Sequence, residues 1–576
     1  MRLVKYAIGL FPDNVKAKFR KNLWLHSTYA KLLQRSGLFY GFPSPEKLQV
    51  LYMNTIRRQS QEIDSLLLKS DCKQKIDVVL VLLGDMKKGK ETLYDLYLEE
   101  RIHTIYIFSA EENEPFLSQG ITSPKNTIKL TTFDQMDENS GRPLLMIRSG
   151  DKLHPAAIPI FLQKQSELNL NDAILYCDCD YLDDNGKRYN AELLPDWNPD
   201  LQLSTGYIKT AVFLYGQALI GDLICFLRQT QAKNLIPNWL ASVYLTKLDV
   251  QIEHLAYTLL HQSPKFLSDW DLNLPESSKG YFSTIANESP GVTSLQWNHL
   301  ANNLVSLIIP TKNSHDLVEK CINSILTKTS YKNFEILLID NNSDDSESLK
   351  YFDELNKHPQ IRVLKFPYPF NYSAINNFAM EHATGDIIGL VNNDVEVITP
   401  DWLSLMVGHV LRDDIGCVGA KLLYPDGRIQ HAGVVMGYGG GAGHAHKYFP
   451  RYHPGYMNRL VASHNFSAVT AACLLVKKAD YQAVGGLDEK NLTVAFNDVD
   501  FCLKVLQLGK RNLYCAEAEL FHHESVSRGL DLSEEKRQRF ENELSYIQTK
   551  WSSYIKKDPA YNSNLTLRRE NFAIRD

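Results

Sequence analysis

The sequence predicts an α/β protein with two Rossmann-like domains in tandem, each built on a mostly parallel sheet, and an additional N-terminal helical segment. Apolar runs of strand length alternate with amphipathic stretches of helix length. This alternation occurs twice along the chain, and polar residues follow the expected strand ends. The 576 residues, 44% of them hydrophobic, are enough for more than one packed core.

The bulk composition argues against several classes of protein. With a net charge of -5, the protein as a whole offers no strongly cationic surface for a nucleic-acid backbone, although local basic patches remain possible. The longest apolar runs, such as VVLVLL at 78–83, are too short to span a bilayer, so we expect neither a membrane-spanning helix nor an exported protein. The nine cysteines lack paired metal-ligand spacing, which suits a reducing, cytoplasmic location.

Residues 1–74 are expected to form the helical N-terminal segment, and its first forty residues are basic and amphipathic. They carry a single acid, Asp13, among many Lys, Arg and aromatic residues. Such a segment would either lie on an anionic membrane surface, which makes the protein peripheral on the inner face of the cytoplasmic membrane, or pack as a solvated helix on the body. The pattern leaves both interpretations open.

Residues 304–530 are expected to form one domain with alternating strands and helices. The expected strands are 304–310, 334–340, 361–366 and 386–391. Ligands of open α/β sheets bind beyond the carboxyl ends of the strands. Three polar clusters follow such ends, namely Pro310-Thr311-Lys312, Asp340-Asn341-Asn342 and Asn392-Asn393-Asp394. We therefore expect one binding site at this edge of the sheet.

Two carboxylates, Asp498 and Asp500, stand just ahead of a helical apolar run in AFNDVDFCLKV at 495–505. Taken alone, this arrangement is typical of a helix cap, because an Asp at a helix start accepts hydrogen bonds from free N–H groups. A catalytic role for these acids needs support from the rest of the chain.

That support comes from five motifs in order, which resemble the family 2 glycosyltransferases of the GT-A fold. The motifs are SLIIPTKN (306–313), EILLIDNNSDD (335–345), VNNDVEV (391–397), VAFNDVDFCLK (494–504) and FHHESVSRG (521–529). The stretches 427–447, 467–478 and 557–567 are similar to a branch that makes bacterial surface polysaccharides such as O-antigen.

The resemblance implies a GT-A fold for both domains and an inverting, metal-dependent glycosyltransferase. The donor would be a dTDP- or UDP-linked nucleotide sugar, and the acceptor a hydroxyl of a glycan or lipid-linked glycan. The sugar would be a hexose or deoxyhexose, with rhamnose as one candidate. A non-catalytic scaffold that binds glycan or nucleotide in a polysaccharide assembly complex is the alternative.

The resemblance also implies roles for single residues. Asp498 would be the general base, whereas Asp500 would provide supporting hydrogen bonds or contact the sugar. Asp394 would bind Mn²⁺ or Mg²⁺ with one of His522 and His523, since neighbours on an extended segment point to opposite sides. The expected donor-binding residues are Pro310, Thr311, Asp340, Asn341, Asn392, Asn393 and Arg528.

The glycine-rich stretch GYGGGAGHAHK at 437–447 is predicted to form neither strand nor helix. It would be either a mobile loop over the donor or acceptor, or a passive surface loop.

Residues 75–270 repeat the plan of the second half, with strands expected at 75–85, 103–110, 126–132 and 143–151, which indicates a duplication. This degenerate domain is expected to lack transferase activity. Arg148 stands where metal-binding acids are expected, and PNWLASVYL at 237–245 contains no carboxylate. The domain would hold acceptor glycan or brace its neighbour.

Four acids of the first half, Asp178, Asp180, Asp183 and Asp184, are interpreted as turn formers. The stretch from Gly84 to Lys90 is close to a P-loop, but Glu91 replaces the Ser or Thr that would bind magnesium, so an NTPase is not expected. Residues 271–303 are polar and rich in Gly, Pro and Ser, as in a linker, and 531–576 are expected to form a helical tail.

Overall fold

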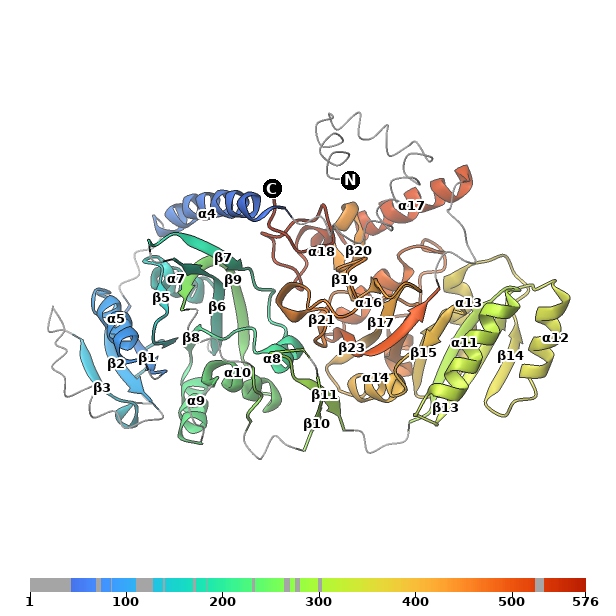
Figure 1. Cartoon of the computed structure of the whole chain (residues 1–576), viewed down its shortest axis with the longest axis horizontal. Helices are drawn as coiled ribbons and strands as arrows, with labels where there is room; N and C mark the ends of the chain where they lie inside the picture. Colours follow the sequence, from blue (N-terminus) through green and yellow to red (C-terminus); the bar gives the residue numbers. More distant parts are fainter. Residues whose placement is uncertain are drawn as a thin grey trace. The chain divides into compact units, whose positions relative to one another are not determined.

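The structure is a computed structural model, and its chain divides into two compact units (Figure 1). It describes residues 43–68, 74–83, 85–109, 128–137, 140–168, 172–183, 185–229, 234–263, 270–274, 280–287, 289–298, 303–523 and 533–576. Unit 1 contains 299–558 and 567–572, and unit 2 contains 43–298, 559–566 and 573–576. The expectation of two α/β domains with mostly parallel strands at the core is confirmed.

Unit 1 is built on a sheet whose path is β14-β13-β12-β15-β22-β17-β23-β16. Four of its strands are mutually parallel, namely β12 (Val305–Thr311), β13 (Phe334–Asp340), β14 (Ile361–Lys365) and β15 (Ile387–Val391). The remaining strands are β22 (Cys473–Lys477), β17 (Ile415–Leu423), β23 (Arg511–His522) and β16 (Val395–Val397). Because β22 is antiparallel to both β15 and β17, it joins the parallel half to the rest of the sheet.

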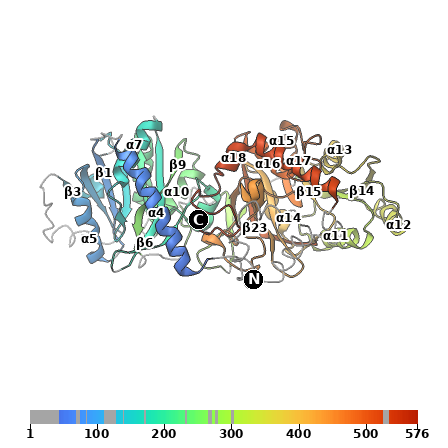
Figure 2. The same ribbon diagram turned by 90° about the horizontal axis from the view of Figure 1, so that it is seen from above.

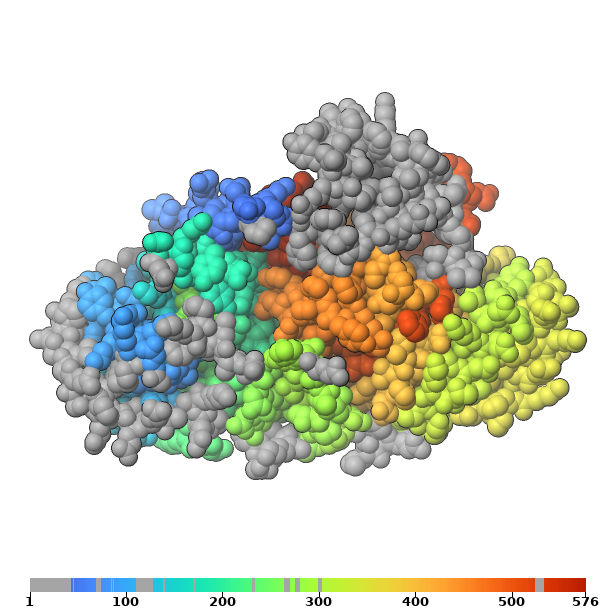
Figure 3. Space-filling model, in the orientation of Figure 1, coloured from blue at the N-terminus to red at the C-terminus, as the bar shows by residue number. Residues whose placement is uncertain are grey.

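Two helices of unit 1, α12 and α13, begin at residues whose side chains cap the helix N-terminus. Asp345 accepts a hydrogen bond from Ser348 N at the start of α12 (Ser346–Leu355), and Asn371 accepts one from Ala374 N at the start of α13 (Tyr372–His382). The other helices are α11 (His315–Lys328), α14 (Trp402–Val410), α15 (Lys478–Ala483), α16 (Asn497–Leu506), α17 (Glu534–Lys550) and α18 (Ser552–Lys556). Side chains of α11 and α12 cover one end of the unit in the space-filling view (Figure 3).

Unit 2 repeats the same sheet, with the path β3-β2-β1-β4-β8-β6-β9-β5. The strands are β1 (Ile76–Val81), β2 (Ile102–Phe108), β3 (Lys129–Thr132), β4 (Leu144–Arg148), β5 (Lys152–Leu153), β6 (Ala173–Leu182), β8 (Ala211–Tyr215) and β9 (Gln251–Gln262). Each pairing has the same direction as its counterpart in unit 1. Even the side pairing of β7 (Arg188–Glu192) with β6 has a counterpart in β18 (Ile429–His431) with β17. This is the topology that a duplication predicts.

The helices of unit 2 surround its sheet. They are α4 (Pro45–Leu67), α5 (Met86–Tyr97), α7 (Ala157–Leu168), α8 (Pro199–Thr205), α9 (Gln217–Gln229) and α10 (Leu235–Leu245). Helix α4 contacts α7, β7 and β9, and Figure 2 shows it along this unit. Residues 1–42 lie outside the described residues, so the membrane-surface contact of the basic segment stays a prediction. Within the described ranges, no helix combines the length and the apolar character needed to cross a bilayer.

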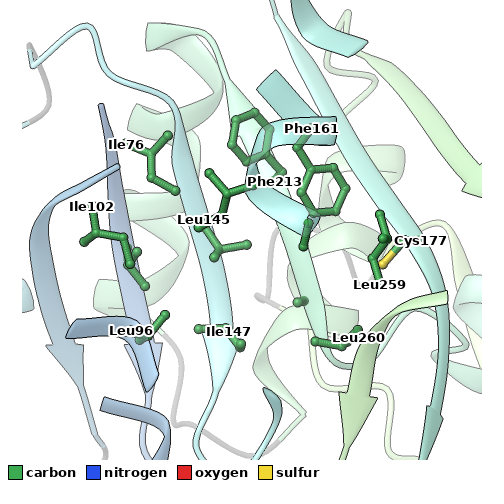
Figure 4. Close-up of a cluster of buried hydrophobic side chains, with 14 of the residues drawn as sticks. Ile76, Leu96, Ile102, Leu145, Ile147, Phe161, Cys177, Phe213, Leu259 and Leu260 are labelled. Carbon is green, nitrogen blue, oxygen red and sulfur yellow. The ribbon is translucent and has the colours of Figure 1, made fainter. Parts of the chain in front are cut away.

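The core of unit 2 forms between the sheet and helices α4, α5 and α7, and Figure 4 shows part of it. Phe161 of α7 and Phe213 of β8 stack with their ring centroids 5.4 Å apart, and both side chains are buried. Leu145 and Ile147 of β4 lie in the same cluster and are completely buried. Fully buried strands explain why the sequence shows continuous apolar runs here rather than alternation.

Two features of unit 2 differ from the sequence expectations. Asp178 and Asp180 are not turn residues but lie within β6, and their side chains are completely buried. Burial of a carboxylate is tolerated when a partner compensates its negative charge. The most prominent partners are His254 Nε2, 2.9 Å from Asp178, and Arg188 Nε, 2.6 Å from Asp180. Asp183 is in the turn that follows, as expected, and Asp184 lies outside the described residues.

The expected linker at 271–303 also contains structure, a hairpin of β10 (Phe282–Ile285) and β11 (Ser294–Trp297). Leu295 and Trp297 lie two positions apart, so they share one face of the strand, and both pack against Leu203 and Ala241. In the C-terminal tail, α17 and α18 are the helical part, and residues 557–576 contain no helix.

The start of α5 agrees with the rejection of a P-loop. The carboxylate of Asp85 accepts hydrogen bonds from Lys87 N and Lys88 N, so the helix N-terminus where a phosphate would bind already has an anion. Gly84 itself lies outside the described residues. The eight cysteines in the described ranges are free thiols.

We predict that Phe213→Ala lowers the free energy of unfolding of unit 2 by roughly 3–5 kcal/mol, because it opens a cavity beneath Phe161. Urea unfolding followed by intrinsic fluorescence and circular dichroism measures the change. Leu98→Ala is the matched control, because Leu98 is 53% exposed and its loss should change stability by about 0.5 kcal/mol or less. Equal effects of the two substitutions would contradict the packing described here.

Candidate functional site

The ends of β12 and β13 in unit 1 lie side by side, with Thr311 opposite Asp340 in the parallel register. Asn341 N donates a hydrogen bond to Thr311 O at 2.8 Å, and the Asp340 carboxylate accepts one from Ser343 N at 2.9 Å. The Asn341 amide donates to the carbonyl oxygens of Phe366 and Tyr368, so this side chain holds the segment after β14. Pro310 lies one position before the end of β12.

The turn between β15 and β16 contributes Asn392, Asn393 and Asp394. Asn393 Nδ2 donates to Thr311 Oγ1 at 2.9 Å, which ties this turn to the end of β12. Asn392 Nδ2 lies 3.2 Å from His522 Nε2. The three expected polar clusters therefore form one continuous set of contacts at the carboxyl edge of the sheet.

The pairing of β16 with β23 decides which histidine reaches Asp394. Val395 pairs with His522, and His522 Nε2 lies 3.1 Å from Asp394 Oδ1, with both side chains nearly buried. His523 points to the opposite side, where its Nε2 lies 3.2 Å from Glu396 Oε2. This arrangement agrees with the expectation that at most one of the two histidines faces the acid.

The ion pairs around His523 form a separate cluster. Lys320 Nζ lies 2.8 Å from the carboxylate of Glu396, and Lys328 Nζ lies 3.2 Å from it. Burial would raise the pKa of Glu396, but hydrogen bonds from Lys320, His523 and Lys328 lower it to about 2. His523 thus contacts the carboxylate of Glu396. His522 is the histidine that lies beside Asp394.

Asp498 is the second residue of α16, and its half-buried carboxylate is held by three hydrogen bonds. Oδ2 accepts from Thr470 Oγ1 at 2.9 Å and from Ala471 N at 3.1 Å, and Oδ1 accepts from Val499 N at 2.9 Å. Burial raises the pKa of Asp498 above its ordinary value although these hydrogen bonds oppose the shift. A carboxylate in such an environment is suited to accept a proton.

Segment 470–472 connects Asp498 to the turn that contains Asp394. Ala471 N donates to Asp498, and Ala472 O accepts a hydrogen bond from Asn392 N at 3.0 Å. Tyr372 OH donates to Ala471 O at 3.2 Å from the opposite side. The acids at 394 and 498, far apart in sequence, are therefore neighbours through one short stretch of backbone.

Asp500 faces the interior and is completely buried. Its Oδ1 accepts hydrogen bonds from Trp551 Nε1 at 2.8 Å and from Lys550 Nζ at 2.6 Å. Of the two roles expected for this acid, supporting hydrogen bonds fit its position and sugar contact does not.

The glycine-rich stretch differs from the loop that the sequence predicted. Two short strands, β19 (Val434–Met436) and β20 (Ala442–His444), pair as an antiparallel hairpin. Gly437, Gly439 and Gly440 lie between them with positive φ, which turns the chain back at little steric cost. The glycines thus form the turn of a hairpin rather than an irregular loop.

Two histidines that sequence analysis did not single out lie near the site, His431 at the end of β18 and His444 at the end of β20 in the hairpin. His431 Nδ1 lies 2.8 Å from His444 Nδ1, and His431 Nε2 accepts from Gly433 N and Thr470 N. Burial, together with His444 and His522 nearby, lowers the pKa of His431 well below its ordinary value. A neutral His431 can therefore support the Thr470 backbone that leads to Asp498. Only the pairing of β19 with β20 brings His444 near, so no local spacing could have indicated it.

Glu543 of α17 is a second residue that sequence analysis missed. Its carboxylate is 2% exposed and accepts hydrogen bonds from Thr493 Oγ1, Val494 N and Ala495 N, at distances of 2.8–3.0 Å. These three residues lie just before Phe496, the N-cap of α16, so Glu543 fixes the backbone that leads into Asp498. Nothing in the local sequence around 543 indicates this role, because the partners are about fifty positions earlier.

The donor set at Asp394 fits a divalent cation. Within the described part of the chain, no group of three or more potential ligands from His, Cys, Asp or Glu occurs. Asp394 and His522 supply two donors of types that Mn²⁺ accepts, and diphosphate oxygens and water commonly complete such a shell. His522 Nδ1 is buried and has no hydrogen-bond partner among the residues described. Arg528 lies outside the described residues, so its expected contact with the diphosphate stays a prediction.

The parallel strands, the acid and imidazole at their carboxyl edge and the elevated pKa of Asp498 define an α/β ligand-binding unit with the features of an enzyme. Residues 306–482 match the family model described as Glycosyl transferase family 2. The chain therefore carries a family 2 glycosyltransferase domain, as its motifs predicted.

Curated relatives and solved structures were also compared with the chain. It is 38% identical over 452 residues to the uncharacterized protein y4gI of Sinorhizobium fredii. This match covers 75% of this chain and 49% of that protein. The chain is 32% identical over 449 residues to the O-antigen biosynthesis protein RfbC of Myxococcus xanthus, covering 74% and 34%. The chain thus spans about half the length of one relative and about a third of the other.

Among solved structures, the chain is similar to a mannosyltransferase from Pyrobaculum calidifontis in complex with GDP-Man and Mn²⁺. The TM-score is 0.32 at 17% sequence identity, and the match covers 42% of this chain and 63% of that one.

We predict that Glu543→Gln lowers the free energy of unfolding of unit 1 by roughly 1–3 kcal/mol, because its new amide group cannot accept the hydrogen bonds that the lost oxygen accepted. Urea unfolding of the full chain measures the difference. Glu541→Gln in the same helix is the control, since Glu541 has a 57% exposed side chain. If the two variants unfold alike, Glu543 does not hold the residues before α16.

Proposed function

We propose that unit 1 is an inverting, metal-dependent glycosyltransferase that moves a sugar from a nucleotide-sugar donor to a glycan hydroxyl in bacterial surface polysaccharide synthesis. The observation that carries this proposal is the connected set of Asp394, His522 and Asp498 in the unit whose residues 306–482 match the family 2 model. The similarity to an O-antigen biosynthesis protein supports O-antigen or capsule as the product.

Asp498 would act as the general base that removes the proton from the attacking acceptor hydroxyl. Hydrogen bonds from Thr470, Ala471 and Val499 orient the carboxylate, and its raised pKa increases its proton affinity. A single displacement, in which the acceptor oxygen attacks C1 opposite the leaving diphosphate, inverts the anomeric centre. One base is enough for such a reaction.

The donor would lie across the ends of β12, β13 and β15. Thr311 and Asp340 would meet its nucleoside, and Asn392 and Asn393 would meet its diphosphate. Asp394 and His522 would hold the divalent cation, which when bound neutralises the charge that develops on the leaving diphosphate. The dTDP- or UDP-linked nature of the donor and the rhamnosyl or hexosyl specificity belong to this proposal.

For unit 2 we propose a non-catalytic role, either holding acceptor glycan or bracing unit 1. Helix α10 begins after Asn234 in the left-handed conformation, as α16 begins after Phe496 in the same conformation. The second residue of α10 is Ile236, where α16 has Asp498. An isoleucine cannot accept a proton, so this copy lacks the base.

We predict that Asp498→Asn lowers the transfer rate by roughly 10²–10⁴-fold or more and leaves donor binding intact, because the amide keeps the shape but cannot take a proton. Purified protein is first screened with Mn²⁺ against a panel of nucleotide sugars by thermal shift. The selected donor is then used to measure transfer and binding in the variant.

Asp353→Asn is the matched control, since Asp353 is an exposed acid of α12 and should leave both measurements unchanged. Normal turnover by Asp498→Asn would refute the assignment of the base. A native chain that binds a donor but neither transfers nor hydrolyses the sugar would favour the scaffold alternative instead.

The pH dependence of kcat/KM gives a separate prediction. The base must be ionised, and burial raises its pKa, so more of it is protonated at a given acid pH than for an ordinary aspartate. Activity should therefore rise with pH along an acid limb whose apparent pKa lies above the ordinary value of about 3.9. Initial rates at saturating Mn²⁺ define the limb. A limb at or below the ordinary value would contradict a desolvated base.

A further inference from the structure

Unit 2 retains an acid and a histidine at the positions of the metal-site pair of unit 1. In unit 1, β16 pairs with β23 so that Val395 is opposite His522, and Asp394 directly precedes Val395. In unit 2, β5 pairs with β9 so that Lys152 is opposite His261, and Asp151 directly precedes Lys152. Asp151 and His261 are therefore the counterparts of Asp394 and His522. The sequence interpretation that this copy had lost its metal-binding acid was incomplete.

The carboxylate of Asp151 is already occupied by a cation of the chain itself. Arg148 Nε donates to Asp151 Oδ2 at 2.9 Å, and Arg148 Nη2 donates to Oδ1 at 3.2 Å, a bidentate pair. Ser263 N also donates to Oδ1 at 2.9 Å. Asp151 is completely buried and Arg148 is 8% exposed, so the pair is shielded from water.

His261 is engaged by a second internal network. Its Nδ1 lies 2.5 Å from Asp180 Oδ1, while Arg188 Nε donates to Asp180 Oδ2 at 2.6 Å and Tyr52 OH donates to the same oxygen. Asp180 therefore holds the imidazole of His261. In unit 1, by contrast, Asp394 meets the imidazole of His522 directly.

We propose that Arg148 is a built-in cation that takes the place of the divalent metal in unit 2, so that this unit holds no metal and cannot bind a nucleotide diphosphate through one. A guanidinium remains charged at all physiological pH values, so the replacement is permanent. A divalent ion beside it would face strong repulsion in a buried site. The proposal rests on the proposed function in one respect, since Asp394 and His522 mark where the metal binds in unit 1.

Manganese binding counted by electron paramagnetic resonance tests this proposal in the full chain. Free Mn²⁺ is titrated with the native protein, with Asp394→Asn, and with Asp394→Asn combined with Arg148→Ala. We expect one bound ion for the native protein, none for Asp394→Asn, and one regained ion for the double variant. Adding Asp151→Asn to the double variant should remove the regained ion.

Thermal unfolding with and without Mn²⁺ provides a second readout. The double variant should melt at a lower temperature than Asp394→Asn, and Mn²⁺ should raise its melting temperature but not that of Asp394→Asn. If Arg148→Ala does not fold, the experiment uses Arg148→Met instead, because methionine keeps the packing of the apolar part of the side chain. Arg142→Ala is the matched control, because Arg142 pairs with Asp77 elsewhere in unit 2 and its loss should create no manganese site.

Two results would overturn the proposal. One is an ion bound by Asp394→Asn that disappears when Asp151→Asn is added, because unit 2 would then hold a metal despite Arg148. The other is a folded Arg148 variant that gains no manganese site. The native chain could bind no Mn²⁺ while the variant with Arg148→Ala gains a site. That result would count against the metal of the proposed function and would support the inference on Arg148.

Discussion

The candidate site depends on the register of one short strand pair, β16 with β23. Only three residue pairs join these strands, yet they place His522 opposite Val395 and therefore beside Asp394. A slip of one residue would turn His522 away and present His523 instead, because side chains alternate between the faces of a strand. The long parallel pairing of β23 with β17 makes such a slip costly, since β23 cannot shift without losing its buried partners.

Asp498, the proposed base, is positioned by segments that lie on both sides of it in the chain. Glu543 holds residues 493–495, ahead of the N-cap of α16, and Trp551 and Lys550 hold Asp500 in the same helix. Segment 470–472 then orients the Asp498 carboxylate and joins it to the strand ends. These contacts fix the start of α16 relative to the edge of the sheet. A general base needs such a fixed position to meet an acceptor hydroxyl at the right distance.

The sequence was informative wherever structure is local or strongly buried. Long apolar runs gave β12, β13 and β15, and the polar residues after them gave Thr311, Asp340 and Asp394, because parallel strands share one carboxyl edge. Features that arise from distant pairing could not be predicted. The two-residue strand β5 and the hairpins β10–β11 and β19–β20 carry too few residues to show a period. Partners such as Glu543 and His444 have no local signal, because the fold alone brings them near.

The two copies of the fold differ in the partners of their buried acids. In unit 2, Arg148 binds Asp151 and Arg188 binds Asp180, and Ile236 stands where α16 of unit 1 has Asp498. Unit 1 keeps a buried acid beside His522, whose Nδ1 has no hydrogen-bond partner among the described residues. An imperfectly satisfied buried group costs stability, and proteins retain it where a ligand completes the set. The Nδ1 of His522, unpaired within the described part of the chain, therefore agrees with the ligand site proposed for unit 1.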